Sequence, residues 1–250
     1  MLRKIALYSG FTLSGAKSFL VAFLRLKFIG LIKFLLGFRK YKLYSTDCRE
    51  YILEPHLNDN TAKTKVSKYY FYQDVWGFET ILDLRPKNIV DIGASHVLVG
   101  MLSKITNVES LDVRPLDVSL KSLKAVYGDI TNLPYINESV ELLNSLCVLE
   151  HIGLGRYGDK IDSGGFRRAC EEISRVLKPG GHLVLSVPVG KPIIVFNAHR
   201  VFSKKEFLSY FSGFEIIREV YCTPEYSESI QQEKLVNGKH HVYCVCLKKI

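Results

Sequence analysis

Apolar residues in the C-terminal part of the chain follow two periods, and this pattern predicts the order of its elements. Helical spacing runs from Tyr69 to Pro86 and returns from Phe166 to Leu177. A short apolar helix is expected at 97–105, and the capping box Ser203-Lys-Lys-Glu206 opens another. Apolar runs predict strands at 88–92, 108–113, 123–127, 140–146, 182–187, 215–221 and 241–247. Strands alternating with helices predict an α/β fold, doubly wound around a mainly parallel seven-stranded sheet.

The N-terminal segment is apolar but interrupted by charge. Residues 18–38 contain Arg25, Lys27 and Lys33, whereas a membrane-spanning helix needs about 20 mostly uncharged residues. Each charge at the bilayer centre costs about 2.5–3.5 kcal/mol on insertion scales. The pattern therefore favours a helix that lies on an anionic membrane surface. Packing against protein, or a true span or signal peptide, are the alternatives.

Charge divides the chain in the same place. The net charge is +9, yet residues 1–42 hold nine basic residues and no acidic one, so the remainder is neutral. This distribution argues against a nucleic-acid-binding catalytic face. We predict a basic helical extension at 1–42, a polar connector at 43–68 and the α/β domain at 69–250. Six scattered cysteines without a CxxC pair indicate a reducing cytosol and no metal site.

Three acidic residues fall at the carboxyl ends of the first three predicted strands, where open α/β sheets bind their ligands. Asp91 stands in the first strand just before Gly93, Asp112 ends the second strand, and Asp129 follows the third beside the apolar Ile130. An acid at the end of the second strand can accept hydrogen bonds from both hydroxyls of a ribose. The sequence therefore predicts a site for a nucleotide-like cofactor.

The strand and glycine turn at 88–95, the acids Asp112 and Asp129, and Leu177-Lys-Pro-Gly-Gly181 resemble the motifs of class I S-adenosylmethionine (SAM)-dependent methyltransferases. The resemblance covers roughly residues 69–248 and implies SAM as the cofactor. It assigns Gly93, Ala94 and Ser95 to the methionine part, Asp112 to the ribose, and Asp129 to the adenine. The family favours Gly-x-Gly-x-Gly in the first loop, and this chain keeps only the first glycine.

A narrower resemblance is to a methyltransferase-like family of unknown function, DUF268. The segments that carry it are Trp76-Gly-Phe78, the Gly-Ala-Ser turn, Leu111-Asp-Val-Arg-Pro115, residues 149–159, Val187-Pro-Val-Gly190 and Phe196-Asn-Ala-His-Arg200. Through bacterial members, this resemblance implies a connection with surface glycans.

Polar residues after the fourth and fifth strands are the candidates for the reaction itself. His151 is the first candidate for a general base, because imidazole titrates near neutral pH, although it can equally order the loop. Asp159 is the second, with a turn cap as its alternative, and His199 would close the site from the other side. Glu150, Arg156, Tyr157 and Arg200 are expected to contact the substrate; Arg200 suits a carboxylate or phosphate or a surface ion pair.

These interpretations predict a SAM-dependent methyltransferase that O-methylates a sugar or glycan precursor in surface-polysaccharide biosynthesis. It would be cytoplasmic and peripheral at the inner face of the membrane, with residues 1–42 on the anionic surface. Two alternatives stay open. One is a non-catalytic scaffold in a glycan-assembly complex, and the other is an enzyme that uses another nucleotide-like ligand such as a nucleotide sugar.

Overall fold

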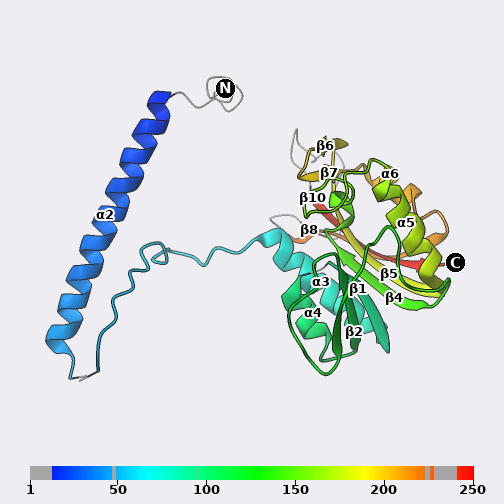
Figure 1. The fold of residues 1–250 in the computed structure, drawn as a ribbon, viewed down its shortest axis with the longest axis horizontal. Coiled ribbons are helices and arrows are strands. Elements are labelled where there is room, and N and C mark those ends of the chain that lie inside the picture. The colour runs from blue at the N-terminus through cyan, green and yellow to red at the C-terminus, as the bar shows by residue number, and fades with distance from the viewer. Residues whose placement is uncertain (1–12, 47–48, 94, 223–225, 228–240) are drawn as a thin grey trace. The chain divides into compact units, whose positions relative to one another are not determined.

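The computed structural model describes residues 13–46, 49–93, 95–222, 226–227 and 241–250, which form two compact units, 1–65 and 66–250. In the first unit, helix α2 (Leu13–Tyr44) is followed by a segment without helix or strand (Figure 1). That segment packs back on the helix, since the ring of Tyr51 lies 5.4 Å from the ring of Phe38. Among the described residues, no helix combines the length and apolarity that crossing a membrane requires.

The second unit is built on one twisted sheet (Figure 1). The strand order is β3-β2-β1-β4-β5-β10-β8-β9, in which β1 to β5 are parallel and β10, β8 and β9 are antiparallel additions. The strands are β1 (Asn88–Ile92), β2 (Asn107–Asp112), β3 (Leu123–Tyr127), β4 (Val140–Leu146), β5 (Leu177–Val189), β8 (Phe214–Cys222), β9 (Tyr226–Ser227) and β10 (His241–Lys249). The predicted α/β class, doubly wound around a mainly parallel sheet, is confirmed, with the two-residue β9 added at one edge.

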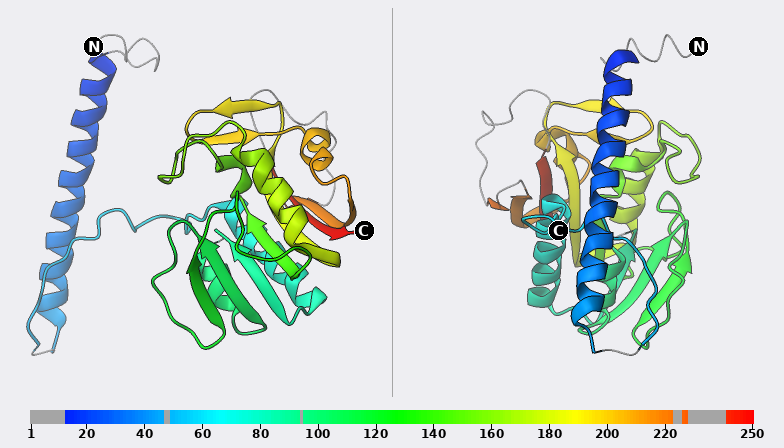
Figure 2. Two further views of the ribbon diagram at one scale, coloured as in Figure 1. Left: turned by 45° about the vertical axis from the view of Figure 1, so that its right-hand side comes forward. Right: turned by 90° about the vertical axis from the view of Figure 1, so that its left-hand side faces the viewer.

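Helices cover both faces of this sheet (Figure 2). On one face lie α3 (Lys68–Leu84) and α4 (His96–Leu102), and on the other lie α5 (Gly165–Val176) and α6 (Lys204–Ser209). The alternation of side chains along a strand feeds both cores. In β10, for example, Tyr243 and Val245 face α5 and α6, whereas Cys244 packs with the α3 and α4 side.

Element boundaries differ from the sequence prediction mainly at glycines. We expected Gly180-Gly181 to end the helix at 166–177, but α5 ends at Val176 and Leu177 already begins β5. Gly181 lies so close to the main chain of β4 that a Cβ there would stand 3.1 Å from the Glu141 carbonyl oxygen. Gly181 therefore serves strand packing, whereas Gly180 takes a left-handed φ of +74°. The predicted capping box at Ser203 is present and opens α6.

Two elements near the carboxyl end of β4 and β5 were not predicted. A single turn of 3-10 helix, η1 (Leu149–His151), follows β4, and a small hairpin of β6 (Ile193–Val195) and β7 (His199–Val201) follows β5. The hairpin packs against η1. These two elements carry most of the candidate reaction residues.

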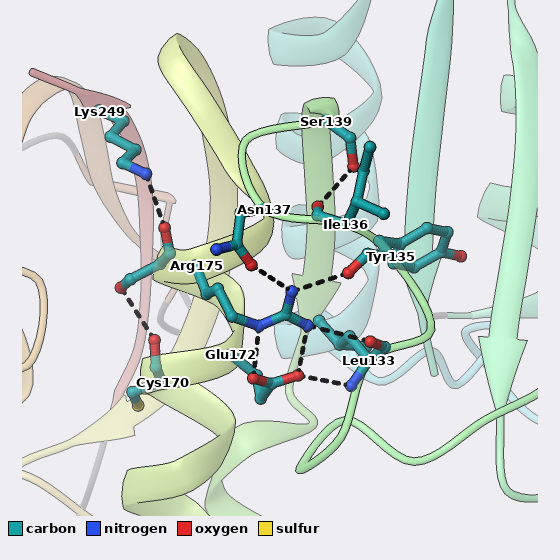
Figure 3. Close-up of polar contacts among 10 residues, drawn as sticks. Leu133, Tyr135, Ile136, Asn137, Ser139, Cys170, Glu172, Arg175 and Lys249 are labelled. Atoms are coloured by element: carbon teal, nitrogen blue, oxygen red, sulfur yellow. Dashed lines mark hydrogen bonds and ion pairs between the residues drawn. The ribbon is translucent and has the colours of Figure 1, made fainter.

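The segment after β3 is held to α5 by one arginine (Figure 3). Arg175 donates to the main-chain oxygens of Leu133 at 3.0 Å and Tyr135 at 2.7 Å, and to Asn137 Oδ1 at 2.9 Å. Both oxygens of Glu172 accept from the same guanidinium at 2.7 Å, which fixes its plane. The chain that leaves β3 is thereby fixed a few residues beyond Asp129.

Candidate functional site

A pocket of about 340 Å³ opens at the carboxyl ends of β1 to β4. Its wall is formed by the turns that follow these strands, by the loop after η1 and by the first turn of α5. The lining residues are Ile92, Gly93, Leu111–Arg114, Gly128–Thr131, Cys147, Val148, His151–Gly153, Tyr157, Asp159, Lys160, Asp162, Gly165 and Arg168. This is the edge at which the sequence predicted a cofactor, and the pocket brings Gly93, Asp112, Asp129 and Ile130 together.

Gly93 needs to be glycine on two counts. Its φ of +62° lies in the left-handed region, which costs other residues roughly 1–2 kcal/mol. A Cβ there would stand 3.1 Å from Val148 Cγ2 and 3.2 Å from Asp112 Oδ2. Without that atom, bare main chain faces the pocket, and a ligand can approach it closely.

Asp112 and Asp129 share one geometry. One oxygen of each carboxylate is held by its own turn: Asp112 Oδ1 accepts from the Arg114 amide at 2.7 Å, and Asp129 Oδ1 accepts from the amide and hydroxyl of Thr131, both at 2.8 Å. Among the described residues, nothing hydrogen-bonds to the second oxygen of either carboxylate. Each acid is thus oriented while keeping one acceptor for a ligand.

Other residues of the predicted cofactor set lie outside the pocket wall. Asp91 is fully buried behind it, where Asn144 Nδ2 donates at 2.6 Å and the Ser110 hydroxyl at 3.4 Å. Ser95 caps α4 by accepting from the Leu98 amide at 3.5 Å. Ala94 lies outside the described residues. In this arrangement Asp91 ties β1 to its neighbours β2 and β4.

His151 lines the pocket with a defined tautomer. Its Nδ1 lies 2.6 Å from the carbonyl oxygen of Ala198. Arg156 Nη1 also lies near Nδ1, at 3.3 Å, but the carbonyl is closer and can only accept, so the ring hydrogen is assigned to Nδ1 and Nε2 keeps its lone pair. Arg156 donates to the same carbonyl at 3.0 Å. The described residues offer Nε2 no hydrogen bond, and Glu150 Oε1 lies 3.6 Å from it.

Burial sets the protonation of this pair. The Glu150 side chain is enclosed, and burial raises the pKa of its carboxyl to about 8. Burial also lowers the pKa of His151 to about 4, an effect that the bond to Ala198 partly opposes. Glu150 Oε2 has no hydrogen-bond partner within the described structure. Near neutral pH both groups are therefore uncharged, with a proton on Glu150 and an open Nε2 on His151.

Asp159 organises the loop in which it lies. Its Oδ2 accepts from the amides of Gly153 at 3.1 Å and Gly155 at 3.3 Å, while Oδ1 accepts from the Tyr157 amide at 3.1 Å. A carboxylate with three main-chain donors is a loop anchor, the alternative that the sequence left open. The ring of Tyr157 then stands edge-on to His151, with centroids 5.5 Å apart.

Arg200 differs from the substrate-binding role expected for it. It is 9% exposed and absent from the pocket wall, and its Nη1 donates to the Ile152 carbonyl at 2.6 Å. His199 and Arg156 are also missing from the wall. The hairpin instead bonds to η1 and the residue after it, through the Ala198 carbonyl and the Arg200 guanidinium, and its residues lie outside the pocket wall.

Several pocket residues escaped the sequence analysis. Arg114 and Thr131 come two residues after the acids at the ends of β2 and β3, and Lys160 directly follows the candidate Asp159, so their position along the chain was an available signal. Arg168 had no comparable signal, because only the fold brings the first turn of α5 to the pocket. Cys147 also lines it, with a thiol that donates to Gln73 Oε1 at 2.8 Å and whose pKa burial raises.

The order and direction of the strands match the fold of solved class I methyltransferase structures. Residues 91–250 match the family described as "Caenorhabditis protein of unknown function, DUF268". That match spans more than half of the chain, so the protein belongs to this family.

Solved structures agree with the fold. Geranyl diphosphate C-methyltransferase from Streptomyces coelicolor A3(2), in complex with Mg2+, geranyl diphosphate and S-adenosyl-L-homocysteine, has 14% identity and a TM-score of 0.52, with 76% of this chain and 85% of that chain covered. The [4+2]-cyclase SpnF has 16% identity and a TM-score of 0.52, with 70% and 81% covered. No curated protein matches the sequence. At such identities the likeness concerns the fold, and these two neighbours carry different chemistry on it.

Proposed function

We propose that this protein is a SAM-dependent methyltransferase that transfers a methyl group to a hydroxyl of a small-molecule acceptor. One observation carries the proposal. Asp112 and Asp129 each keep one carboxylate oxygen without a partner among the described residues, and both line the same pocket as the exposed main chain of Gly93. SAM offers two ribose hydroxyls and an exocyclic amine, which are the donors that such carboxylates accept. The residues present therefore fit this cofactor.

Each residue has a stated task in this proposal. Asp112 Oδ2 accepts from the ribose, Asp129 Oδ2 accepts from the adenine amine, and Ile130 supplies the apolar wall. The open main chain at Gly93 admits the methionine part. When bound, the cofactor supplies an electrophilic methyl group on a sulfonium centre.

His151 is the residue of the pocket wall that can take a proton from an acceptor hydroxyl. The Ala198 carbonyl holds the hydrogen on Nδ1, which leaves Nε2 as the basic atom. The neutral form of the ring, favoured by burial, is the form that accepts. Asp159 fixes the main chain of the loop, and Tyr157 packs against the imidazole, so both act by positioning.

The acceptor class that we favour is a sugar or glycan precursor. Support comes from the loop after η1, which lines the pocket with the hydroxyl of Tyr157 and with the charged Lys160 and Asp162. Polar groups of this kind can hydrogen-bond the several hydroxyls of a sugar, whereas the apolar Ile130 suits the adenine end.

Residues 1–42 would hold the enzyme on an anionic membrane surface. They carry nine basic residues and no acid, and α2 exposes large apolar side chains such as Phe28, Ile32 and Leu36. The test is co-sedimentation of the full chain with vesicles. Binding to phosphatidylglycerol vesicles that weakens with salt and is absent with phosphatidylcholine supports the proposal, and no binding at low salt refutes it.

Calorimetric titration with SAM and S-adenosylhomocysteine tests the cofactor assignment. The full chain, its Asp112→Ala variant and the matched control Asp117→Ala, at an exposed acid outside the pocket wall, are compared. We expect saturable binding by wild type and control, and binding by Asp112→Ala that is weaker by about tenfold or more. Equal affinity in all three would remove the ribose role of Asp112.

The same titration separates the alternatives. A folded wild-type protein that binds neither compound would favour a non-catalytic scaffold, and stabilisation by a nucleotide sugar instead would favour another nucleotide-like ligand. If the cofactor binds, His151→Gln is expected to retain that binding and lose methyl transfer to sugar acceptors.

A further inference from the structure

The pocket holds more charge than the cofactor accounts for. Four carboxylates and three cations line it: Asp112, Asp129, Asp159 and Asp162 against Arg114, Lys160 and Arg168. In the proposed function, Asp112 and Asp129 serve the cofactor. The remaining charges lie on the loop after η1, on α5 and on Arg114, and their partners within the protein decide what is left for a ligand.

The two loop carboxylates are already satisfied. Asp159 accepts three main-chain amides. Asp162 accepts the Gly164 amide at 2.9 Å and forms an ion pair with Arg168, which neutralises that arginine. Asp159 is thus satisfied by the main chain, and Arg168 is paired with Asp162, so none of the three side chains is left to bind an anion.

Lys160 and Arg114 remain. Lys160 is exposed to the pocket and forms no hydrogen bond or ion pair with any part of the chain that the structure describes. The Arg114 guanidinium carbon lies 4.3 Å from the centroid of the Tyr157 ring. Stacking on a ring face leaves the N–H groups at the edge of the guanidinium plane, and no described carboxylate receives them. Both cations thus present donors without an acceptor.

Tyr157 relates this cation pair to the proposed base. The Arg114 guanidinium lies over a face of the Tyr157 ring. The same ring packs edge-on with the His151 ring, with the centroids 5.5 Å apart. Lys160 follows three residues later on the same loop and lines the same pocket. Positive charge therefore gathers on the side of the pocket where the proposed acceptor meets His151.

We propose that Arg114 and Lys160 form a subsite for an anionic group, a phosphate or a carboxylate, carried by the acceptor. The inference rests on the proposed function, since it names the acceptor class of the same site. Two cations with free donors suit anionic oxygens. The acceptor would accordingly be a sugar phosphate or a uronic acid and not a neutral sugar.

The test measures binding of three probes to the full chain by calorimetry, with and without saturating S-adenosylhomocysteine. The probes are glucose 1-phosphate, glucuronate and glucose, so that the two anionic sources are separated from the shared sugar. The variants are Arg114→Gln and Lys160→Gln, and Lys191→Gln is the matched control at an exposed lysine outside the pocket wall. Each amide keeps much of the side-chain length and removes the charge.

We expect at least one anionic probe to bind, glucose not to bind, and each pocket variant to weaken the anionic probe by about tenfold. Affinity for S-adenosylhomocysteine should stay unchanged. Failure of both anionic probes to bind wild type, or equal binding by the variants and the control, overturns the subsite. A parallel fall in S-adenosylhomocysteine affinity also overturns it, because the cations would then serve the cofactor's own carboxylate.

The two proposals fail separately. If S-adenosylhomocysteine does not bind but glucose 1-phosphate binds in a Lys160-dependent manner, the cofactor assignment is wrong and the anion subsite stands. If the cofactor binds normally and neither anionic probe does, the methyltransferase proposal stands without this acceptor class.

Discussion

Glu150→Gln should remove a pH dependence from the stability of the protein. Glu150 lies just after β4 with its carboxyl buried, one oxygen without a hydrogen-bond partner within the described structure, and its pKa raised by burial to about 8. In the unfolded chain a glutamate titrates near 4.3. The folded state therefore holds a proton over a pH range in which the unfolded state releases it, and glutamine, which has the same shape, carries no such proton.

The sign and size follow from linkage. A raised folded-state pKa contributes stability that is fully present below pH 4.3 and is lost as the pH rises to about 8. The loss proceeds at about 1.4 kcal/mol per pH unit, so between pH 6.5 and 8 it amounts to about 2 kcal/mol. His151 acts in the opposite direction: its pKa is lowered to about 4, so its contribution is present above pH 6.5 and is lost as the pH falls. Wild type and Glu150→Gln share the contributions of His151 and of the buried cysteines, so the difference between the two proteins from pH 6.5 to 8 isolates Glu150.

The assay is urea denaturation of the full chain at pH 6.5 and pH 8.5, with wild type, Glu150→Gln and the surface control Glu171→Gln, whose carboxylate is exposed on α5. Relative to wild type, Glu150→Gln should gain about 2 kcal/mol between the two pH values. The buried amide adds donors that lack partners, so its absolute stability at pH 6.5 is expected to be lower. A difference between wild type and Glu150→Gln that stays constant across this range would refute the buried, protonated carboxyl.

Three further substitutions test the local arguments. Gly93→Ala should lower the melting temperature and abolish SAM binding, because a Cβ at φ +62° adds strain and meets Asp112 Oδ2; unchanged binding in calorimetry would contradict the close approach proposed there. Arg175→Met should cost about 1–3 kcal/mol in urea denaturation through the lost charged hydrogen bonds to the segment after β3; a loss within error would show that the ion pair with Glu172 carries no net stability. Asp159→Ala should speed hydrogen exchange at the Gly153 and Tyr157 amides, because both donate hydrogen bonds to the Asp159 carboxylate. Unaltered protection of these amides would contradict its anchoring role.

Much of the fold could be predicted because each strand carries its own signal. The limits of β3 and β4 coincide with the predicted 123–127 and 140–146, where apolar residues recur over five and seven residues. The β6–β7 hairpin was missed although β6 is an apolar run. Its strands are three residues long, and every residue of β6 is exposed, so no alternation of buried and exposed positions marks it. The limits of α5 and β5 were misplaced because glycine is permitted in both a helix end and a tightly packed strand.

The pocket residues that could be predicted are those whose place in the pocket follows from their own position along the chain. Asp112 and Asp129 sit at strand ends, and strand ends meet at one edge of a parallel sheet. Asp91 lies behind the pocket wall, where it accepts a hydrogen bond from Asn144, 53 residues away in the sequence. No pattern of residues around Asp91 predicts that bond. Residues whose role depends on a partner distant in sequence are thus the ones that composition and spacing could not assign.

The same reasoning explains why two separate segments belong to one site. Residues 149–159 and 196–200 both carried the resemblance to the family, and in the structure they bond to each other. The Ala198 carbonyl accepts hydrogen bonds from His151 and Arg156, and Arg200 donates one to the Ile152 carbonyl. Neither segment can fix the His151 tautomer alone: η1 supplies the ring, and the hairpin supplies the acceptor that holds its hydrogen on Nδ1. The hairpin, which the sequence analysis did not predict, therefore determines whether Nε2 is free to accept a proton.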